Sequence, residues 1–302
     1  MKLKGLIAAV HTPMHDDFNV NYDRVPAQAE HLAKGGASGA FVTGTTGECH
    51  SLTTEERLKM FDAWGRSAHR NGLKFIAHVG HNNLPDAQAL VRSARDSGAD
   101  AISAMAPNFF KPADAQSLCD WFVKVTKPAP ELPFYFYDIP SMTGVMVETD
   151  AFLDIAKERL PGFVGVKFTN QDYDLLQRCM ANTSVKADML FGTDERLIEG
   201  LGFGCVGAVG STYNFASPLY LRIINAFNRG DMESAKEDQA QSLQMIKRMY
   251  ENGFAAACKA AMGFAGVDCG PVRPPIDRIS AENLVSLRKD LDAMGFFDWA
   301  IK

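Results

Sequence analysis

The 302-residue sequence predicts an α/β fold, a (β/α)8 TIM barrel with a C-terminal helical extension. Three observations support this prediction. Short apolar runs recur roughly every thirty residues over the first 230 residues, and amphipathic stretches separate them. After about residue 230 only helical patterns remain. Because parallel strands return through right-handed crossovers, a series of eight strand–helix units is expected to close into a barrel.

The apolar runs are predicted strands. They are rich in Val, Ile, Phe and Ala and lack clean polar alternation, which is typical of parallel strands buried on both faces. The predicted strands cover residues 6–10, 40–43, 75–79, 101–105, 134–137, 163–168, 189–191 and 206–209. An open doubly wound sheet is the alternative, but no GxGxxG follows the first run.

Helical signals lie between these runs. Thr53 and Glu56 form a capping-box pattern before a helix over residues 54–70. Pro85 begins the next helix, whose end is marked by Ser97 and Gly98. Further helices of the barrel are predicted over residues 114–126, 150–159, 173–181 and 218–227.

The predicted domain boundary lies at residue 230. Residues 1–230 form the barrel and carry the active site, and residues 231–302 form a three-helix extension. The predicted helices of the extension cover residues 231–250, 254–264 and 281–294, with three prolines between the last two. Because no flexible linker precedes the extension, we expect it to pack on the barrel.

Composition limits the function classes. Hydrophobic residues make up 46% and charged residues 22%, which excludes a disordered chain. The net charge of −5 disfavours nucleic acid and anionic membranes as partners. No run approaches the ~20 apolar residues of a membrane span, and the N-terminal apolar stretch is too short for a secretory signal. The six cysteines form no CxxC pair, so we expect reduced thiols and a cytoplasmic protein.

Two residues at predicted strand ends could carry chemistry. Lys167 ends the run FVGVK, where desolvation would lower its pKa and provide an amine nucleophile. A lysine whose head reaches solvent is an equally good interpretation. Tyr137 ends FYFY and could relay protons, although an interface aromatic with a bonded hydroxyl is more common.

Polar loops follow three other predicted strands. The loop GTTGE contains Thr45 and Thr46 and could cup a carboxylate, or it could be a simple turn. It lacks the GK[ST] ending of a phosphate-binding P-loop. In FGTDE, Asp194 and Glu195 could accept sugar hydroxyls or complement a helix N-terminus. Ser211 in GSTYN could bond a hydroxyl or a carboxylate.

A metal site has weak support. His78 and His81 form an HxxH pattern, but it lacks helical geometry and a third ligand at recognisable spacing. A metal-dependent hydrolase therefore stays an alternative that chelator sensitivity would reveal. No G-x-S-x-G motif supports a serine hydrolase. We expect no metal and no cofactor.

The motifs GTTGE, YDIPSMTG, VGVKF and GAVGSTYN, in this order, resemble the class I pyruvate-dependent aldolases. That superfamily includes dihydrodipicolinate synthase and N-acetylneuraminate lyase, and the resemblance covers nearly the whole chain. FGTDE and GSTYN are similar to the lyase branch. Met142 stands where the synthases place an arginine that binds a second substrate carboxylate, and methionine cannot offer that fork of donors.

The resemblance implies reversible cleavage of N-acetylneuraminate to N-acetylmannosamine and pyruvate by a cytoplasmic homotetramer of carbohydrate metabolism. Lys167 would form the Schiff base and Tyr137 would move the proton. The implied substrate-binding residues are Thr45, Thr46, Thr169, Gly192, Asp194, Glu195 and Ser211. The alternatives are an aldolase of the same superfamily acting on another 2-keto acid and a non-catalytic sensor. The presence of both Lys167 and Tyr137 argues against the sensor.

Two positions depart from the family pattern. Phe109 lies where many bacterial members carry a tyrosine of a proton relay, so that relay cannot operate through this position. Asp138 replaces the frequent asparagine after the catalytic tyrosine. Proton transfer must then depend on Tyr137, the substrate carboxylate or water.

Overall fold

Eight parallel strands form the centre of the molecule. The computed structural model describes residues 3–302, and in it the strands close into a barrel in sequence order. The strands are β1 (Gly5–Ala9), β2 (Gly39–Val42), β3 (Lys74–His78), β4 (Ala101–Met105), β5 (Phe134–Asp138), β6 (Phe163–Phe168), β7 (Asp188–Phe191) and β8 (Gly207–Gly210). Each predicted strand is present with ends that differ by at most one residue. The predicted barrel is therefore confirmed.

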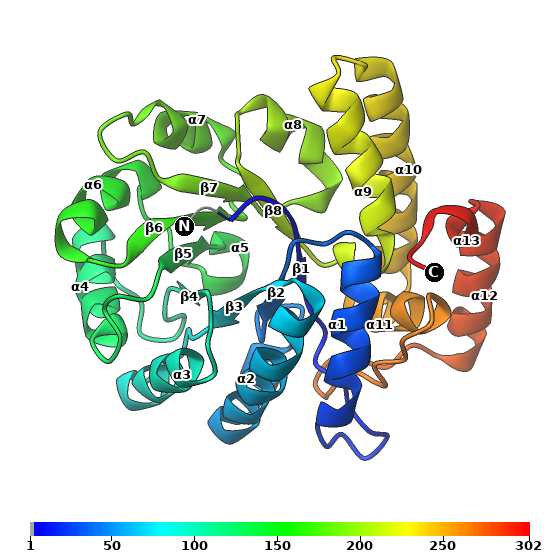
Figure 1. Cartoon of the computed structure of the whole chain (residues 1–302), viewed down its shortest axis with the longest axis horizontal. Coiled ribbons are helices and arrows are strands. Elements are labelled where there is room, and N and C mark those ends of the chain that lie inside the picture. Colours follow the sequence, from blue (N-terminus) through cyan, green and yellow to red (C-terminus); the bar gives the residue numbers. More distant parts are fainter. Residues whose placement is uncertain (1–2) are drawn as a thin grey trace.

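Helices surround the barrel on its outer side (Figure 1). They are α1 (Val25–Lys34), α2 (Thr54–Ala68), α3 (Leu84–Asp96), α4 (Ala115–Thr126), α6 (Thr149–Arg159), α7 (Tyr173–Ala181), α8 (Leu197–Gly202) and α9 (Tyr213–Asn228), with a single turn α5 (Pro140–Thr143) after β5. The predicted capping box of α2 is present, because the Thr53 hydroxyl accepts the Glu56 N–H and the Glu56 carboxylate accepts the Thr53 N–H. The sequence analysis predicted no helix at the positions of α1 and α8.

The start of α9 differs from the prediction. Pro218 was expected to begin this helix, but the helix begins at Tyr213 and contains the proline. Proline removes one helical hydrogen bond. The residues of the first turn, including Tyr213 and Phe215, are fully buried, and α9 packs against β1. Burial of this turn outweighs the missing bond.

The C-terminal helices gather on one side of the barrel, beside α9 and α1 (Figure 1). They are α10 (Met232–Glu251), α11 (Phe254–Phe264), α12 (Ala281–Ala293) and the short α13 (Phe296–Trp299), which the sequence pattern missed. The Ile301 N–H donates to the Phe215 carbonyl at 2.9 Å, so the chain end returns to α9. The helical extension is confirmed, whereas a domain boundary at residue 230 stays a prediction.

Side chains alternate between the barrel interior and the helices. On β5, Phe134 and Phe136 pack outward against Phe122 of α4, while Tyr135 and Tyr137 belong to the inner cluster. The β5–β6 pairing contains one irregularity. Phe134 pairs with Phe163 but Tyr135 pairs with Gly165, and from there Tyr137 pairs with Lys167. The two predicted catalytic residues are thus direct neighbours on adjacent strands, and both side chains face inward.

Three observations concern the membrane, disulfide and metal expectations of the sequence analysis. Within residues 3–302, no helix is long and apolar enough to cross a membrane. All six cysteines carry free thiols. The described part of the chain contains no group of three or more His, Cys, Asp or Glu side chains that could hold a metal ion.

Candidate active site

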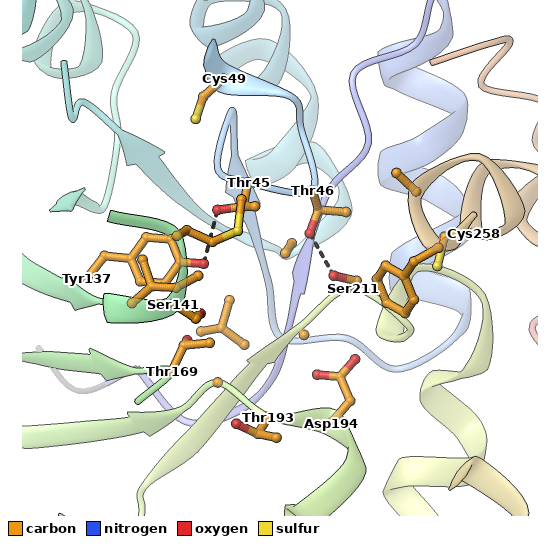
Figure 2. A pocket seen from close by; sticks show the side chains of 18 of the residues that line it. Thr45, Thr46, Cys49, Tyr137, Ser141, Thr169, Thr193, Asp194, Ser211 and Cys258 are labelled. Atoms are coloured by element: carbon orange, nitrogen blue, oxygen red, sulfur yellow. Dashed lines mark hydrogen bonds between the residues drawn. The ribbon is translucent and has the colours of Figure 1, made fainter. Parts of the chain in front are cut away.

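A cavity of about 640 Å³ opens at the C-terminal ends of the strands. This end of a (β/α)8 barrel is where active sites lie. Every site residue predicted from the sequence lines it, and Figure 2 shows several of them facing one another. These residues are Thr45, Thr46, Tyr137, Lys167, Thr169, Gly192, Asp194, Glu195 and Ser211. The residues predicted from the sequence therefore meet at one cavity, and their roles remain predictions.

Lys167 lies near the end of β6 and is only 4% exposed. Its Nζ is 3.8 Å from the centre of the Tyr137 ring and 4.4 Å from that of Phe41. Burial lowers the pKa of the amine to about 7, although the charges of Asp194 and Cys49 act in the opposite direction. Lys167 lines the cavity while being almost wholly buried, and a substantial fraction of its amine is neutral and nucleophilic near pH 7.

Tyr137 is fixed beside this amine. Its hydroxyl lies 3.2 Å from Thr45 Oγ1, and its ring packs edge-on against Phe41 and His78. Burial raises the pKa of the phenol well above its usual value, while the hydrogen bond with Thr45 lowers it. Tyr137 is therefore a protonated phenol at physiological pH.

The GTTGE loop leaves β2 and brings two hydroxyls to the cavity. Thr45 contacts Tyr137, and Thr46 Oγ1 lies 2.7 Å from Ser211 Oγ, which ties this loop to the loop after β8 (Figure 2). Gly47 lets the GTTGE loop pack closely against the residue that follows β1, because a Cβ at this position would lie 3.0 Å from the Val10 carbonyl oxygen. The two threonines and Ser211 form a polar wall.

Asp194 and Glu195 differ in their freedom to bind a ligand. Asp194 is buried, and its Oδ2 accepts the Thr212 N–H at 2.9 Å and the Thr212 hydroxyl at 2.6 Å. Burial and the neighbouring Glu195 charge raise the pKa of Asp194 to about 6. Glu195 is half-buried and receives the Tyr250 hydroxyl at 3.4 Å. Neither carboxylate makes a cap hydrogen bond, but both lie in the first turn of the short helix Asp194–Arg196, so complementing the helix N-terminus remains an alternative role for their charges.

Thr169 and Gly192 face each other across the loops after β6 and β7. Thr169 Oγ1 is buried. A Cβ on Gly192 would lie 1.9 Å from that oxygen. Gly192 therefore leaves room for this buried hydroxyl, whose hydrogen-bonding interaction lowers the pKa of Tyr137.

The sequence analysis missed one wall of the cavity. Ile246 and Tyr250 of α10, together with Phe254 and Cys258 of α11, line it from the C-terminal extension. Their spacing of four residues was a usable signal, but such periodicity marks an apolar face without showing what it faces. His11 was also missed. Burial and the Lys259 charge lower the pKa of His11 to about 3, and its Nε2 has no partner among residues 3–302.

The two departures from the family pattern lie outside the cavity lining. Asp138 Oδ2 accepts the Thr149 hydroxyl at 2.9 Å and the Asn170 amide at 3.1 Å, so it anchors the end of β5 to α6 and to the loop after β6. Burial raises the pKa of Asp138 to about 6. Phe109 is exposed on the loop after β4.

His78 and His81 do not converge on a common point. His78 is buried beside Tyr137, and its Nδ1 lies 3.1 Å from the Thr43 carbonyl oxygen. His81 Nδ1 accepts the Asn83 N–H in the next loop. The two imidazoles are thus held by separate local contacts.

The fold and the site together define a (β/α)8-barrel protein built around a desolvated lysine amine. The sequence pattern of the dihydrodipicolinate synthetase family matches residues 2–294, and the chain belongs to this family.

Named relatives resemble the chain over almost its entire length. It is 34% identical over 302 residues to N-acetylneuraminate lyase of Rattus norvegicus, covering 99% of this chain and 94% of the relative. The solved structure of Proteus mirabilis N-acetylneuraminate lyase matches with a TM-score of 0.94 at 36% identity, covering 98% of this chain and 100% of that one. The N-acetylneuraminate lyase of Aliivibrio salmonicida matches equally well, with 98% of each chain covered.

Proposed function

We propose that this protein is a class I aldolase that reversibly cleaves N-acetylneuraminate into N-acetylmannosamine and pyruvate. The observation that carries the proposal is the buried Lys167 amine, which lies between Phe41 and Tyr137 in a cavity that also contains Asp194 and Glu195. The relatives named as N-acetylneuraminate lyases support the choice of substrate.

The reaction begins at the amine. The neutral Lys167 Nζ attacks the C2 ketone of the open-chain sugar acid to give a carbinolamine. Its hydroxyl takes up one proton and leaves as water, which gives a protonated imine. The C3–C4 bond then breaks, and its electron pair moves toward the imine nitrogen to form an enamine. The C4 hydroxyl loses its proton and becomes the aldehyde of N-acetylmannosamine. Protonation of the enamine at C3 and hydrolysis release pyruvate and the free amine, so no redox partner or cofactor is needed.

Tyr137 transfers the proton in this scheme. Because the buried phenol is protonated, it can accept the C4 proton only if it passes its own proton on. The substrate carboxylate, held next to Thr45, is the acceptor. Thr45 lies 3.2 Å from the phenol and orients it for this transfer. In the synthetic direction the same path runs in reverse.

The remaining residues hold the two ends of the substrate. Thr45 and Thr46 bind the carboxylate and orient C2 toward Lys167. Thr169, Gly192 and Ser211 shape the wall along the sugar chain. Asp194 and Glu195 accept hydroxyls of the polyol tail, with Glu195 the more available of the two because Thr212 already engages Asp194.

The cavity disfavours a dicarboxylic substrate. Met142 lines the cavity at the position where the synthases carry an arginine. A thioether offers no N–H donors to a second carboxylate, whereas a polyol tail needs only the acceptors that Asp194 and Glu195 provide. This contrast supports the lyase reaction over that of the synthases.

The assembly is a homotetramer in the cytoplasm. Three large apolar side chains are exposed on the loops that follow β4 and α5: Phe109, Phe110 and Met146. Exposed apolar groups of this kind are typical of interaction surfaces, and a second copy of the chain would cover them. The free cysteine thiols are consistent with a reducing compartment.

The decisive experiment measures pyruvate release from N-acetylneuraminate by the purified protein, with and without a metal chelator. We expect release that is insensitive to the chelator. No release from N-acetylneuraminate would reject the proposed substrate, and loss of release with chelator would reject the metal-independent mechanism.

A further inference from the structure

A buried ion pair joins the GTTGE loop, whose Glu48 lines the cavity, to the C-terminal extension. Lys259 Nζ of α11 is 2.7 Å from Glu48 Oε1 at the end of the GTTGE loop. The two side chains are 3% and 1% exposed. Replacing a buried ion pair by apolar residues is often neutral or stabilising, so stability alone does not account for this one.

Both partners are fastened further to the segment after α11. The other oxygen of Glu48, Oε2, accepts the Arg273 N–H at 2.7 Å. Lys259 Nζ donates to the Pro271 carbonyl at 2.7 Å. The Arg273 guanidinium in turn binds both oxygens of Glu56 at 2.8 Å. The pair is therefore part of a network that fixes the start of α2 and the GTTGE loop to the C-terminal extension.

The pair connects two walls of the cavity. Glu48 follows Thr46 by two residues, and its N–H donates to the Thr45 carbonyl at 3.0 Å, so a shift of Glu48 moves the loop that carries both hydroxyls. Glu48 adopts a φ of 58°, a left-handed conformation that non-glycine residues seldom adopt without support from their surroundings. On the other side, Lys259 directly follows Cys258, which lines the cavity.

We propose that Glu48 and Lys259 are positioning residues whose ion pair sets the distance between the Thr45–Thr46 hydroxyls and the Lys167 amine. The inference rests on the proposed function, because that function assigns the loop to the substrate carboxylate. Glu48 lines the cavity, but Lys259 and the Arg273 N–H engage its two carboxylate oxygens, so both residues act by placing the loop. Their effect is on how the carboxylate end of a 2-keto acid is held when the imine forms.

The test measures imine formation directly. Wild type and variants are incubated with increasing pyruvate and trapped with sodium borohydride, and mass spectrometry gives the pyruvate concentration for half-maximal modification of Lys167. The variants are Glu48→Asp, which keeps the charge but shortens the anchor by one methylene, and the double variant Glu48→Gln/Lys259→Met, which removes both charges. The control is Asp238→Asn, which removes the partner of Arg222 in an ion pair between α9 and α10. Thermal unfolding is recorded for every protein.

In both Glu48 variants we expect the pyruvate concentration for half-maximal trapping to rise at least about tenfold. The reason is that a displacement of a binding group by ~1 Å can lower reactivity by up to ~10²-fold. The maximal trapped fraction should change far less, and the control should match the wild type. Folded variants with wild-type half-saturation would overturn the positioning role. Failure of Glu48→Asp to fold would also overturn it, because the pair would then serve the fold itself. Absence of trapping in the wild type would instead reject the proposed aldolase function.

Discussion

The amine of Lys167 owes its reactivity to its surroundings. It lies over two aromatic rings in a buried cavity, where its charged form loses most of its hydration. Aromatic faces attract the ammonium form, but this attraction does not replace the lost water.

Substitution of Lys167 by alanine should abolish catalysis and leave the fold intact. No other amine is placed over the Tyr137 ring in the described structure, so we expect a loss of about 10³-fold or more in kcat. Pyruvate release and circular dichroism measure the two effects. Substantial remaining activity in the folded variant would remove Lys167 from its role.

The pH dependence of activity should follow the Lys167 amine. Its pKa of about 7 means that the nucleophilic form disappears as pH falls through 7, so kcat/KM should drop on the acidic side. The Asp194 charge raises this pKa. Replacing Asp194 by asparagine should therefore lower the pKa of Lys167, so that imine trapping with borohydride persists to lower pH than in the wild type. An unchanged pH profile would contradict the interaction between Asp194 and Lys167.

Gly192 offers a test with a matched control. In Gly192→Ala the new methyl group would meet Thr169 Oγ1 and displace it, so we expect kcat/KM to fall by about tenfold or more. Gly202→Ala at the end of α8 adds the same methyl group where nothing lies within 4 Å. Steady-state kinetics should separate the two variants, and equal activities would show that Thr169 is not needed.

At the scale of elements, strands proved easier to predict than helices. A strand buried on both faces is a short apolar run, and parallel pairing brings all its polar end residues to one edge, so the loops with Thr45, Asp194 and Ser211 could be grouped from the sequence alone. The contribution of α10 and α11 could not be predicted, because periodicity gives an apolar face but not its neighbour. The predicted start of α9 at Pro218 was wrong, because burying the residues before it stabilises the helix by more than the hydrogen bond that the proline removes.

The missed wall leads to a prediction for α10. In Tyr250→Phe the ring stays stacked on Phe254, but the hydrogen bond with Glu195 is lost. A net bond energy of about 1 kcal/mol corresponds to a several-fold rise in KM for N-acetylneuraminate. Pyruvate half-saturation of imine trapping should stay unchanged, since the proposed binding mode places Tyr250 beside the polyol tail, which pyruvate lacks. A change in pyruvate affinity alone would contradict this placement.

At the scale of the whole molecule, the exposed apolar loops should control assembly. Phe109 and Phe110 are 77% and 84% exposed, and a charged residue there could not be buried against a second copy without a large desolvation cost. We expect Phe109→Asp/Phe110→Asp to shift the mass measured by light scattering from a tetramer to smaller species. Val285→Asp on α12, another exposed apolar position, is the control. An unchanged mass in the double variant would place the interface elsewhere.

The irregular step in the β5–β6 pairing has a consequence for the length of the chain. Val164 is the additional residue between Phe163, which faces Phe134, and Gly165, which faces Tyr135. Deleting this one position would leave a regular ladder in which Gly165 still faces Tyr135 and Lys167 still faces Tyr137, so Lys167 would keep its inward direction. A second deletion in the first half of β6 would slide the rest of the strand by one place and turn Lys167 toward the helices, so this stretch can lose one residue and no more.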